Sequence, residues 1–382
     1  MGVTRLRFTT AGESHGPSLV GIVEGIPAGL TLDLGPIDAE LARRQEGYGR
    51  GGRMRIETDR IELLSGTKGG VTLGSPIAFL VQNKDSVIEQ LPPVVSPRPG
   101  HADLAGCQKY GHKDGRAVLE RASARETAAR VAAAGIVRQV LDAFGIEVFA
   151  HVLSVGGVSV CQDAWDAAGV DRVALRSESL FHALDPAAEA ALLERVDQAK
   201  EAQDSLGGRF EVRALGLPPG LGSYQQPAER LTARLGAALF SIPAIKGVEI
   251  GMGMAVADAL GSLVHDPIDP APAGAHTPFA RRSNRAGGLE GGLTTGEDLV
   301  LRAAMKPIPT LRRGIDSVDL ETGATAPATH QRSDVTSVPA ASVVGEAVVV
   351  LALGEAFLDK YGGDSMEQVA AAHTFHMGQI AR

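Results

Sequence analysis

The sequence predicts an α+β fold, organised as one large domain over residues 1–382. Strand-like and helix-like segments both occur along the chain, and no composition break or internal repeat separates one region from another. A chain of this length can bury a substantial core. Aromatic residues make up only 4% of it, so Ala, Val, Leu and Gly must fill that core.

The N-terminal region predicts two strands and a helix. Residues 5–9 are typical of a short strand, and residues 19–24 alternate like a second one. Residues 37–46 have a helical pattern that stops at Gly47. The following segment, 48–53, is rich in glycine and arginine and predicts a flexible basic loop, which is either a lid or only a connection.

The clearest predicted helix begins at Ser123. Ser123 and Glu126 fit a capping box, apolar residues follow at helical spacing, and Gly145 can end the helix. Its first turn offers unpaired N–H groups beside Arg121 and Arg125, which suits an anion. A well-capped structural helix is the alternative, and the two interpretations are compatible.

Further elements follow in the second half. Asp185 and Pro186 open a helix that extends to about Gln203, and residues 228–240 are also predicted helical. Residues 266–284 predict a long loop. Four apolar segments are interpreted as strands or buried apolar stretches: 210–215, 248–250, 299–304 and 343–353.

Composition excludes several classes of protein. The net charge of −8 argues against general nucleic-acid binding. The two cysteines lack metal-ligand or redox spacing, and no metal site is expected. There is no signal peptide pattern, and the most apolar stretch, 343–353, is too short for a membrane span and contains Glu346. We therefore expect a soluble, cytoplasmic protein.

Arginine is concentrated in two places, residues 43–60 and 109–130. Arginine forks match carboxylate and phosphate groups, so an acidic protein with such clusters suggests a small polyanionic ligand. Two solvated basic faces explain the same pattern equally well.

Two histidines lie in glycine-containing polar segments. His15 is within residues 12–17, and His101 is within residues 98–103. Histidine exchanges protons near neutral pH, and glycine lets backbone approach a ligand closely. A solvated or structural imidazole is the alternative for each.

Two motifs match known signatures only formally. Residues 12–16 fit G-x-S-x-G, but the segment leads toward a strand, whereas the nucleophile elbow of a hydrolase leads into a helix. Gly251 and Gly253 begin a G-x-G-x-x-G pattern, but Val256 occupies its last position. Neither a hydrolase nor a Rossmann fold is favoured.

Taken together, the remaining motifs closely resemble chorismate synthase, nearly end to end. Three signature regions are present: residues 12–27, residues 123–127 with the alanine-rich helix that follows, and residues 332–334 with 345–347 downstream. Between them lie the segments 98–103, 246–251, 283–284, 291–292 and 306–310. Each is weak alone, but the ordered set is highly specific.

The resemblance implies a β-α-β sandwich and an enzyme that makes chorismate from 5-enolpyruvylshikimate 3-phosphate. Phosphate and a ring C6 hydrogen leave in an anti-1,4-elimination that requires reduced FMN. A homotetramer, an external flavin reductase and NADPH as indirect reductant are also implied. An FMN-binding oxidoreductase and a non-catalytic anion-binding module are the alternatives.

The resemblance also assigns residue roles. His101 would protonate or stabilise the departing phosphate, His15 would keep reduced flavin in its working protonation state, and Asp334 would assist proton removal through flavin N5. Residues matching substrate or NADP positions are Arg44, Arg50 and Arg125. Residues matching flavin-binding positions are Arg121, Ala122, Ser123, Ala244, Gly291, Lys306, Pro307, Ile308, Pro309, Thr310 and Arg332. Ala122 and Pro243 replace polar residues that are common in the family.

Overall fold

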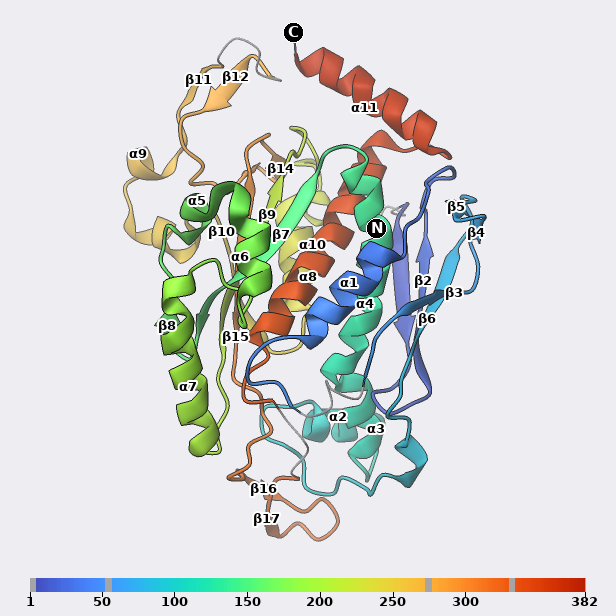
Figure 1. Cartoon of the computed structure of the whole chain (residues 1–382), viewed down its shortest axis with the longest axis vertical. Helices are drawn as coiled ribbons and strands as arrows, with labels where there is room; N and C mark the ends of the chain where they lie inside the picture. The colour runs from blue at the N-terminus through green and yellow to red at the C-terminus, as the bar shows by residue number, and fades with distance from the viewer. Residues whose placement is uncertain (1–4, 52–56, 272–276, 330–333, 382) are drawn as a thin grey trace.

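The structure is a computed structural model that describes residues 5–51, 57–271, 277–329 and 334–381. Two antiparallel sheets enclose a layer of helices (Figure 1). One cluster of buried side chains contains residues of both sheets and of the helices between them. This β-α-β sandwich confirms the predicted fold class.

The smaller sheet contains the N-terminal strands. Its order is β1-β2-β6-β3, and the alternate residues Ile77, Phe79 and Val81 of β6 are buried on the helix side. The bounds are Arg7–Ala11 for β1, Ser18–Glu24 for β2, Ile61–Leu63 for β3 and Ile77–Gln82 for β6. Both strands predicted near the N-terminus are confirmed, the first displaced by two residues.

The larger sheet has the order β10-β15-β9-β7-β8. Its bounds are Ile245–Ile250 for β10, Leu299–Met305 for β15, Gly208–Leu215 for β9, Glu147–Val155 for β7 and Val158–Ser159 for β8. Three of the four apolar segments whose type the sequence left open are therefore strands.

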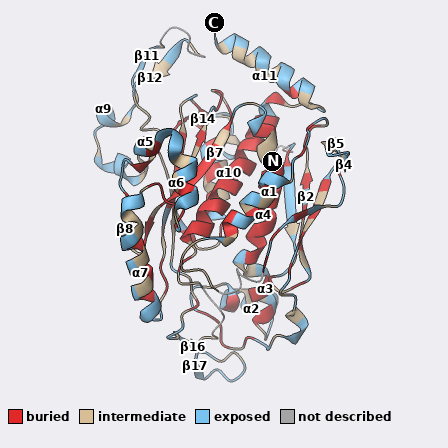
Figure 2. Cartoon of the chain, in the orientation of Figure 1, coloured by how far each residue is buried: buried red, intermediate tan, exposed pale blue. Residues whose placement is uncertain are grey.

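The fourth apolar segment lies inside a helix, α10 (Val338–Tyr361), which crosses the centre of the molecule. Figure 2 shows α10 and the neighbouring α4 buried along most of their length. Among the described helices, α10 is long and apolar enough to span a membrane, but 94% of its most apolar window is buried inside the protein. It is packed as a core helix.

Other helices pack around α10. The bounds are Gly35–Gln45 for α1, Thr127–Asp142 for α4 and Leu231–Phe240 for α8. The peripheral helices are Asp103–Tyr110 (α2), Arg116–Ala122 (α3), Ala164–Ala168 (α5), Arg172–Glu178 (α6), Glu189–Glu201 (α7), Gly261–Val264 (α9) and Met366–Ile380 (α11). The predicted helices at 37–46, 185–203 and 228–240 correspond to α1, α7 with its preceding 3₁₀ turn Pro186–Ala188, and α8.

Four small two-stranded pairs lie outside the two main sheets of the described chain. They pair Thr67–Lys68 (β4) with Val71–Thr72 (β5), Ile268–Pro270 (β11) with Phe279–Arg281 (β12), Leu289–Glu290 (β13) with Leu293–Thr294 (β14), and Asp316–Val318 (β16) with Thr325–Pro327 (β17). The β11–β12 hairpin lies where the sequence predicted only a loop, because three residue pairs form a short antiparallel ladder there.

The structure confirms Ser123 as a capping residue, but Glu126 does not make the reciprocal bond predicted for a capping box. Ser123 Oγ accepts from the backbone N–H of Arg125 at 3.3 Å, so Ser123 caps the 3₁₀ turn Ala124–Glu126 that leads into α4. The Glu126 carboxylate accepts instead from Thr10 Oγ1 at 2.6 Å and from Arg130 Nε at 2.9 Å. The reciprocal bond of a capping box is therefore replaced by a link between α4 and β1.

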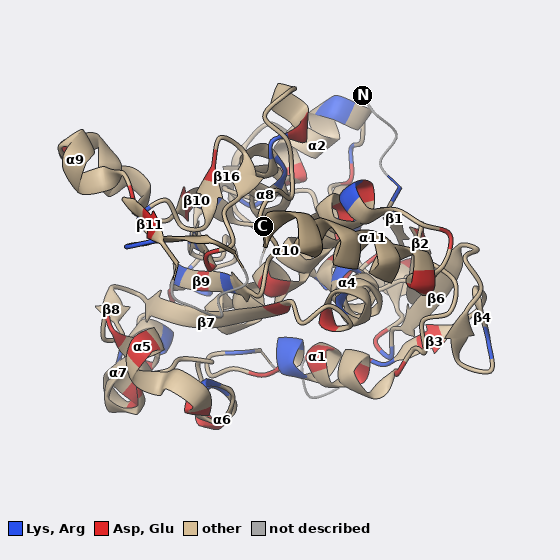
Figure 3. Cartoon of the chain, turned by 90° about the horizontal axis from the view of Figure 1, so that it is seen from above, with Lys and Arg blue, Asp and Glu red and all other residues tan. Residues whose placement is uncertain are grey.

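Charged residues are distributed over the whole molecule. Figure 3 shows basic and acidic positions interspersed over the sheets and the helices between them. The two arginine clusters of the sequence thus do not form one continuous basic face. Their members must be located individually.

Candidate active site

A cavity of about 550 Å³ lies at the lower end of the sandwich in Figure 1, where α4 and α10 begin and β15 ends. Its walls come from segments far apart in the sequence: 44–51, 98–102, 119–127, 242–244, 305–310 and 334–344. Residues of the motifs 98–103, 123–127 and 306–310, Asp334 of the motif 332–334, and part of each arginine cluster therefore meet here. A volume of this size is typical of small-molecule sites.

Two cavity arginines share one buried carboxylate. Asp59 Oδ2 lies 2.7 Å from Arg44 Nη2 and 2.6 Å from Arg125 Nη1. Burial, together with the positive charges of Arg125 and Arg50, lowers the pKa of Arg44 to about 10 despite Asp59. Arg44 Nε is buried and has no hydrogen-bond partner among the described residues. A second buried carboxylate, Glu57, lies 3.8 Å from Arg125 Nη2, so two carboxylates pair with these two arginines in this corner of the cavity.

Asp334 also lines the cavity and is held by Arg50 and Gly51, which follow α1, and by Ser337, which precedes α10. Its Oδ2 lies 2.7 Å from Arg50 Nη1 and accepts from Ser337 Oγ at 2.5 Å, while Oδ1 accepts from the Gly51 backbone N–H at 2.6 Å. Arg50 also donates to Ser337 Oγ at 2.9 Å. The basic loop predicted after α1 is thereby attached, where it is described, to the start of α10.

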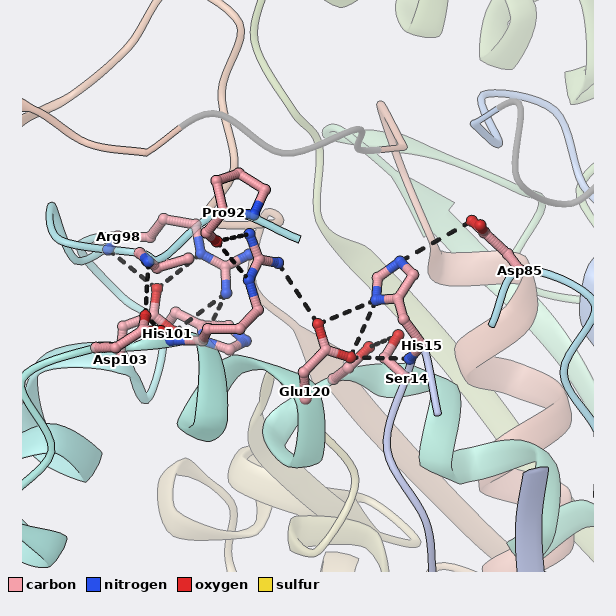
Figure 4. Close-up of polar contacts among 12 residues, drawn as sticks. Ser14, His15, Asp85, Pro92, Arg98, His101, Asp103 and Glu120 are labelled. Carbon is pink, nitrogen blue, oxygen red and sulfur yellow. Dashed lines mark hydrogen bonds and ion pairs between the residues drawn. The ribbon is translucent and has the colours of Figure 1, made fainter. Parts of the chain in front are cut away.

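His101 lines the cavity, and its imidazole is held at Nδ1 by a buried carboxylate. Its Nδ1 lies 2.5 Å from Asp103 Oδ1, and Asp103 is fully buried at the start of α2. Arg98 Nε donates to Asp103 Oδ2 at 2.8 Å, and Arg98 Nη1 donates to Thr310 Oγ1 at 3.1 Å (Figure 4). The predicted loop histidine is therefore part of a buried hydrogen-bonded group.

His15 lies just outside the cavity lining. Its Nδ1 is 3.0 Å from Glu120 on α3, and its Nε2 is 4.0 Å from Asp85 (Figure 4). Burial alone would raise the pKa of Glu120, but hydrogen bonds and charge from His15, and the charge of Arg116, lower it. The neighbouring Ser14 accepts from the cavity residue Ser123 at 3.2 Å, which connects the His15 loop to the site.

Most residues matched to flavin-binding positions line the cavity. They are Ala122, Ser123, Ala244, Lys306, Ile308, Pro309 and Thr310. Lys306 Nζ donates to the carbonyl of Gly100, and burial and the charge of Lys246 lower the Lys306 pKa. Ala244 has a left-handed backbone with φ of 71°, which is uncommon for a residue with a side chain.

Three other predicted residues, Arg121, Gly291 and Pro307, are not in the cavity lining. Arg121 Nη1 donates to the Gly12 carbonyl at 3.0 Å and Nη2 to that of Thr10 at 2.9 Å, so its guanidinium braces β1. Gly291 forms the β13–β14 turn, and neither it nor Pro307 is in the cavity lining. Arg332 lies outside the described residues.

The structure adds functional candidates that the sequence analysis missed. Arg98, Asp103 and Ser337 join the groups around His101 and Asp334, whereas Asp59 and Glu120 provide buried negative charge. Asp103 lies two residues from His101 in the sequence, and this spacing could have indicated that the two side chains interact. Glu120 is 105 positions from His15, so the sequence contained no local pattern that would pair them.

The hydrolase motif has the wrong surroundings. Ser14 is buried in the connection between the antiparallel strands β1 and β2, and an elbow serine would precede a helix. The absence of that strand–turn–helix context agrees with the prediction from sequence.

The fold and the cavity define a class: a β-α-β sandwich protein with a partly apolar cavity that carries arginines and a buried histidine–carboxylate pair. The particular family follows from comparison with known proteins. The family model described as chorismate synthase matches residues 6–358. The chain belongs to the chorismate synthase family and is an enzyme of that family.

Individual relatives agree over almost the whole length. A chorismate synthase of Desulforudis audaxviator is 50% identical, with 98% of each chain covered. One of Rubrobacter xylanophilus is 51% identical and covers 98% of this chain and 97% of its own. A crystal structure of chorismate synthase superposes with a TM-score of 0.81 at 40% identity and covers 98% of both chains.

Proposed function

We propose that this protein converts 5-enolpyruvylshikimate 3-phosphate into chorismate by anti-1,4-elimination of phosphate, with reduced FMN as cofactor. The observation that carries the proposal is the cavity, in which His101 and Asp334 lie on one lining with Arg44, Arg50 and Lys306. The cations match a substrate with two carboxylates and one phosphate, and the two acid–base groups match the loss of a proton and of an anion.

The arginines have the role of binding and orientation. Arg44 and Arg125 line the cavity and are fixed by Asp59, so they offer their positive charge with little rearrangement. Preorganised cations stabilise the charge that develops on a leaving phosphate. We assign Arg44, Arg50 and Arg125 to the anionic groups of the substrate.

The cavity also fits a flavin. Leu119, Ile242, Met305 and Val344 give it an apolar wall for an aromatic ring system. Ala122, Ser123, Ala244, Lys306 and Thr310 would hold the cofactor, with Lys306 as the cation for its phosphate. When bound, reduced FMN supplies the electron density that the side chains lack.

The protein's own acid–base groups divide the proton transfers. When the C–O bond breaks, its electron pair leaves with the phosphate, and His101 Nε2 gives a proton to the phosphate oxygen. Asp334 assists removal of the proton from ring C6, and the electron pair of that C–H bond forms the new ring double bond. His15 would keep the bound cofactor in its working protonation state. Positioned proton transfer of this kind contributes about 10²–10⁴ in rate.

The test is anaerobic conversion of 5-enolpyruvylshikimate 3-phosphate with FMN reduced by dithionite, followed by chorismate absorbance. We expect product with reduced FMN and none with oxidised FMN. A folded protein that binds FMN but forms no chorismate would instead favour the oxidoreductase alternative. Repeating the assay with NADPH alone tests the need for an external flavin reductase.

The remaining expectations belong to the same proposal. We propose a homotetramer that works in the cytoplasm, with NADPH as indirect reductant through a separate reductase. The support is the family membership over residues 6–358. Sedimentation of the purified protein tests the oligomeric state.

A further inference from the structure

In both histidines of the proposed mechanism, Nδ1 lies within hydrogen-bonding distance of a buried carboxylate (Figure 4). For His15 the carboxylate is Glu120, 3.0 Å away through either oxygen. For His101 it is Asp103, at 2.5 Å. Only His101 of the two lines the cavity, so the Asp103 contact bears directly on the reacting group.

The Asp103 carboxylate is fixed on both oxygens. Oδ2 accepts from Arg98 Nε at 2.8 Å and from the Arg98 backbone N–H at 3.1 Å, and Oδ1 accepts from Arg98 Nη2 at 3.1 Å. The Asp103 side chain has no solvent exposure, and that of Arg98 is 8% exposed. Since Arg98 is itself bonded to Thr310, the carboxylate cannot turn away from the imidazole.

This arrangement selects one form of the imidazole. Burial alone would raise the pKa of Asp103, but hydrogen bonds and charge from His101 and Arg98 hold it well below its usual range. An ionised carboxylate only accepts, so the proton between the two groups is on Nδ1. Arg98 Nη2 is also 3.0 Å from Nδ1 and could donate there only if Nδ1 carried no proton; the carboxylate oxygen at 2.5 Å is nearer and can only accept, and Arg98 Nη2 has that same oxygen as an acceptor at 3.1 Å, so the geometry favours Nδ1–H.

The other ring nitrogen is then available for chemistry. Among the parts of the chain that the structure describes, no hydrogen bond to His101 Nε2 is formed. A neutral imidazole with Nδ1–H has its lone pair on Nε2, and its protonated form carries the transferable proton there.

We propose that Asp103, held by Arg98, is a positioning residue that keeps His101 in the Nδ1–H form with Nε2 as the proton-transferring atom. The inference rests on the proposed role of His101 and adds the group that sets its tautomer and balances its charge. A buried aspartate behind a catalytic histidine acts in this way in serine proteases, where the change to asparagine lowers kcat by about 10⁴.

The first test is ¹⁵N NMR of the free protein labelled at histidine, at a pH where imidazole is neutral. The His101 signals are assigned by their loss in His101→Gln. We expect the wild-type proton on Nδ1, and its loss in Asp103→Asn, because the amide can donate to that nitrogen. A wild-type proton on Nε2, or an unchanged tautomer in Asp103→Asn, would overturn the proposal.

The second test separates positioning from folding. Asp103→Asn should lower kcat on the order of 10²–10⁴-fold and leave KM within about threefold. Glu211→Gln is the matched control, because Glu211 is also a buried carboxylate bonded to a histidine, His151 at 3.3 Å, away from the cavity. Wild-type kcat in Asp103→Asn, or an equal loss in the control, contradicts a positioning role.

The experiments distinguish a wrong role for His101 from a wrong positioning role for Asp103. If Asp103→Asn does not fold, the wild-type tautomer alone decides the case. If His101→Ala keeps full turnover, the role of His101 is wrong, whereas the NMR result still reports whether Asp103 sets the ring.

Discussion

The buried arginines of the cavity are stabilised by buried carboxylates, and Asp59 is the nearest of these. Asp59 has no exposed side-chain area and joins Arg44 to Arg125. Both arginines are nearly as buried as the aspartate, with 5% and 3% of their side chains exposed. A buried cation without its partner is costly, so the stability of this wall depends strongly on Asp59, although Arg125 also has the buried Glu57 carboxylate 3.8 Å away.

Asp59→Ala should therefore lower the free energy of unfolding by about 3–5 kcal/mol, because it removes the carboxylate paired with buried Arg44 and the nearer of the two carboxylates paired with buried Arg125. Urea unfolding measures the change. Asp269→Ala, which breaks the exposed Asp269–Arg282 pair, is the control and should change stability little. An equal effect of the two substitutions would mean that burial of the pair is unimportant.

His101→Ala should lower turnover by about 10²–10⁴ with FMN affinity close to wild type, because the imidazole serves proton transfer. Steady-state kinetics and flavin titration measure the two quantities. His265→Ala, at an exposed position outside the cavity lining, should leave both unchanged. Undiminished turnover in His101→Ala would remove the phosphate-protonation role.

At this scale the sequence indicates which residues to consider but not how they are paired. The segment 98–103 identified His101, yet the roles of Arg98 and Asp103 depend on a turn that folds the side chains onto each other. Glu120 and His15 meet only because α3 packs beside the β1–β2 connection. Such long-range contacts leave no local pattern.

Among the elements, α10 shows most clearly why sequence periodicity failed. Nearly all of its residues are buried, so apolar side chains surround it and no amphipathic period distinguishes it from a strand. By contrast, α1 and β2 each have one buried side and were recognised. Glycines let α10 approach its neighbours: a Cβ at Gly345 would lie 2.3 Å from the Phe210 ring.

Gly345→Ala should therefore destabilise the protein by about 1–3 kcal/mol, because α10 and β9 must separate to admit the methyl group. Gly236→Ala in α8 is the matched control, since no atom lies within 4 Å of its Cβ position. There, higher helix propensity should raise stability by about 0.5–1 kcal/mol. Thermal unfolding of both variants tests the pair, and destabilisation of Gly236→Ala alone would contradict it.

Across the whole molecule, buried carboxylates link the layers. Glu346 of α10 lies 3.0 Å from Arg43, 2.6 Å from Arg138 and 3.1 Å from Arg176. Burial alone would raise the pKa of Glu346, but these arginines lower it to about 2. Burial alone would also raise the pKa of Glu211, but its contacts with His151 and Arg213 lower that pKa to about 2.

These shifts predict how stability depends on pH. Each pKa is lower in the folded state than the ordinary 4.5, so the stabilisation is complete above pH 4.5 and is lost as pH falls to about 2. Urea unfolding at several pH values between 5 and 2 measures this slope. Glu346→Gln should be less stable at neutral pH and less pH-dependent in that window, and a slope equal to wild type would exclude the Glu346 contribution.

The central position of α10 also has a consequence for the order of folding. Both sheets precede α10 in the chain, yet they pack against the helical layer of which it is the longest member. During synthesis, the inner faces of β6 and β9 have left the ribosome long before residues 338–361 arrive to help cover them. A nascent chain with uncovered strands is prone to aggregate. Completion of the core, and of the cavity at its end, therefore waits for one late helix.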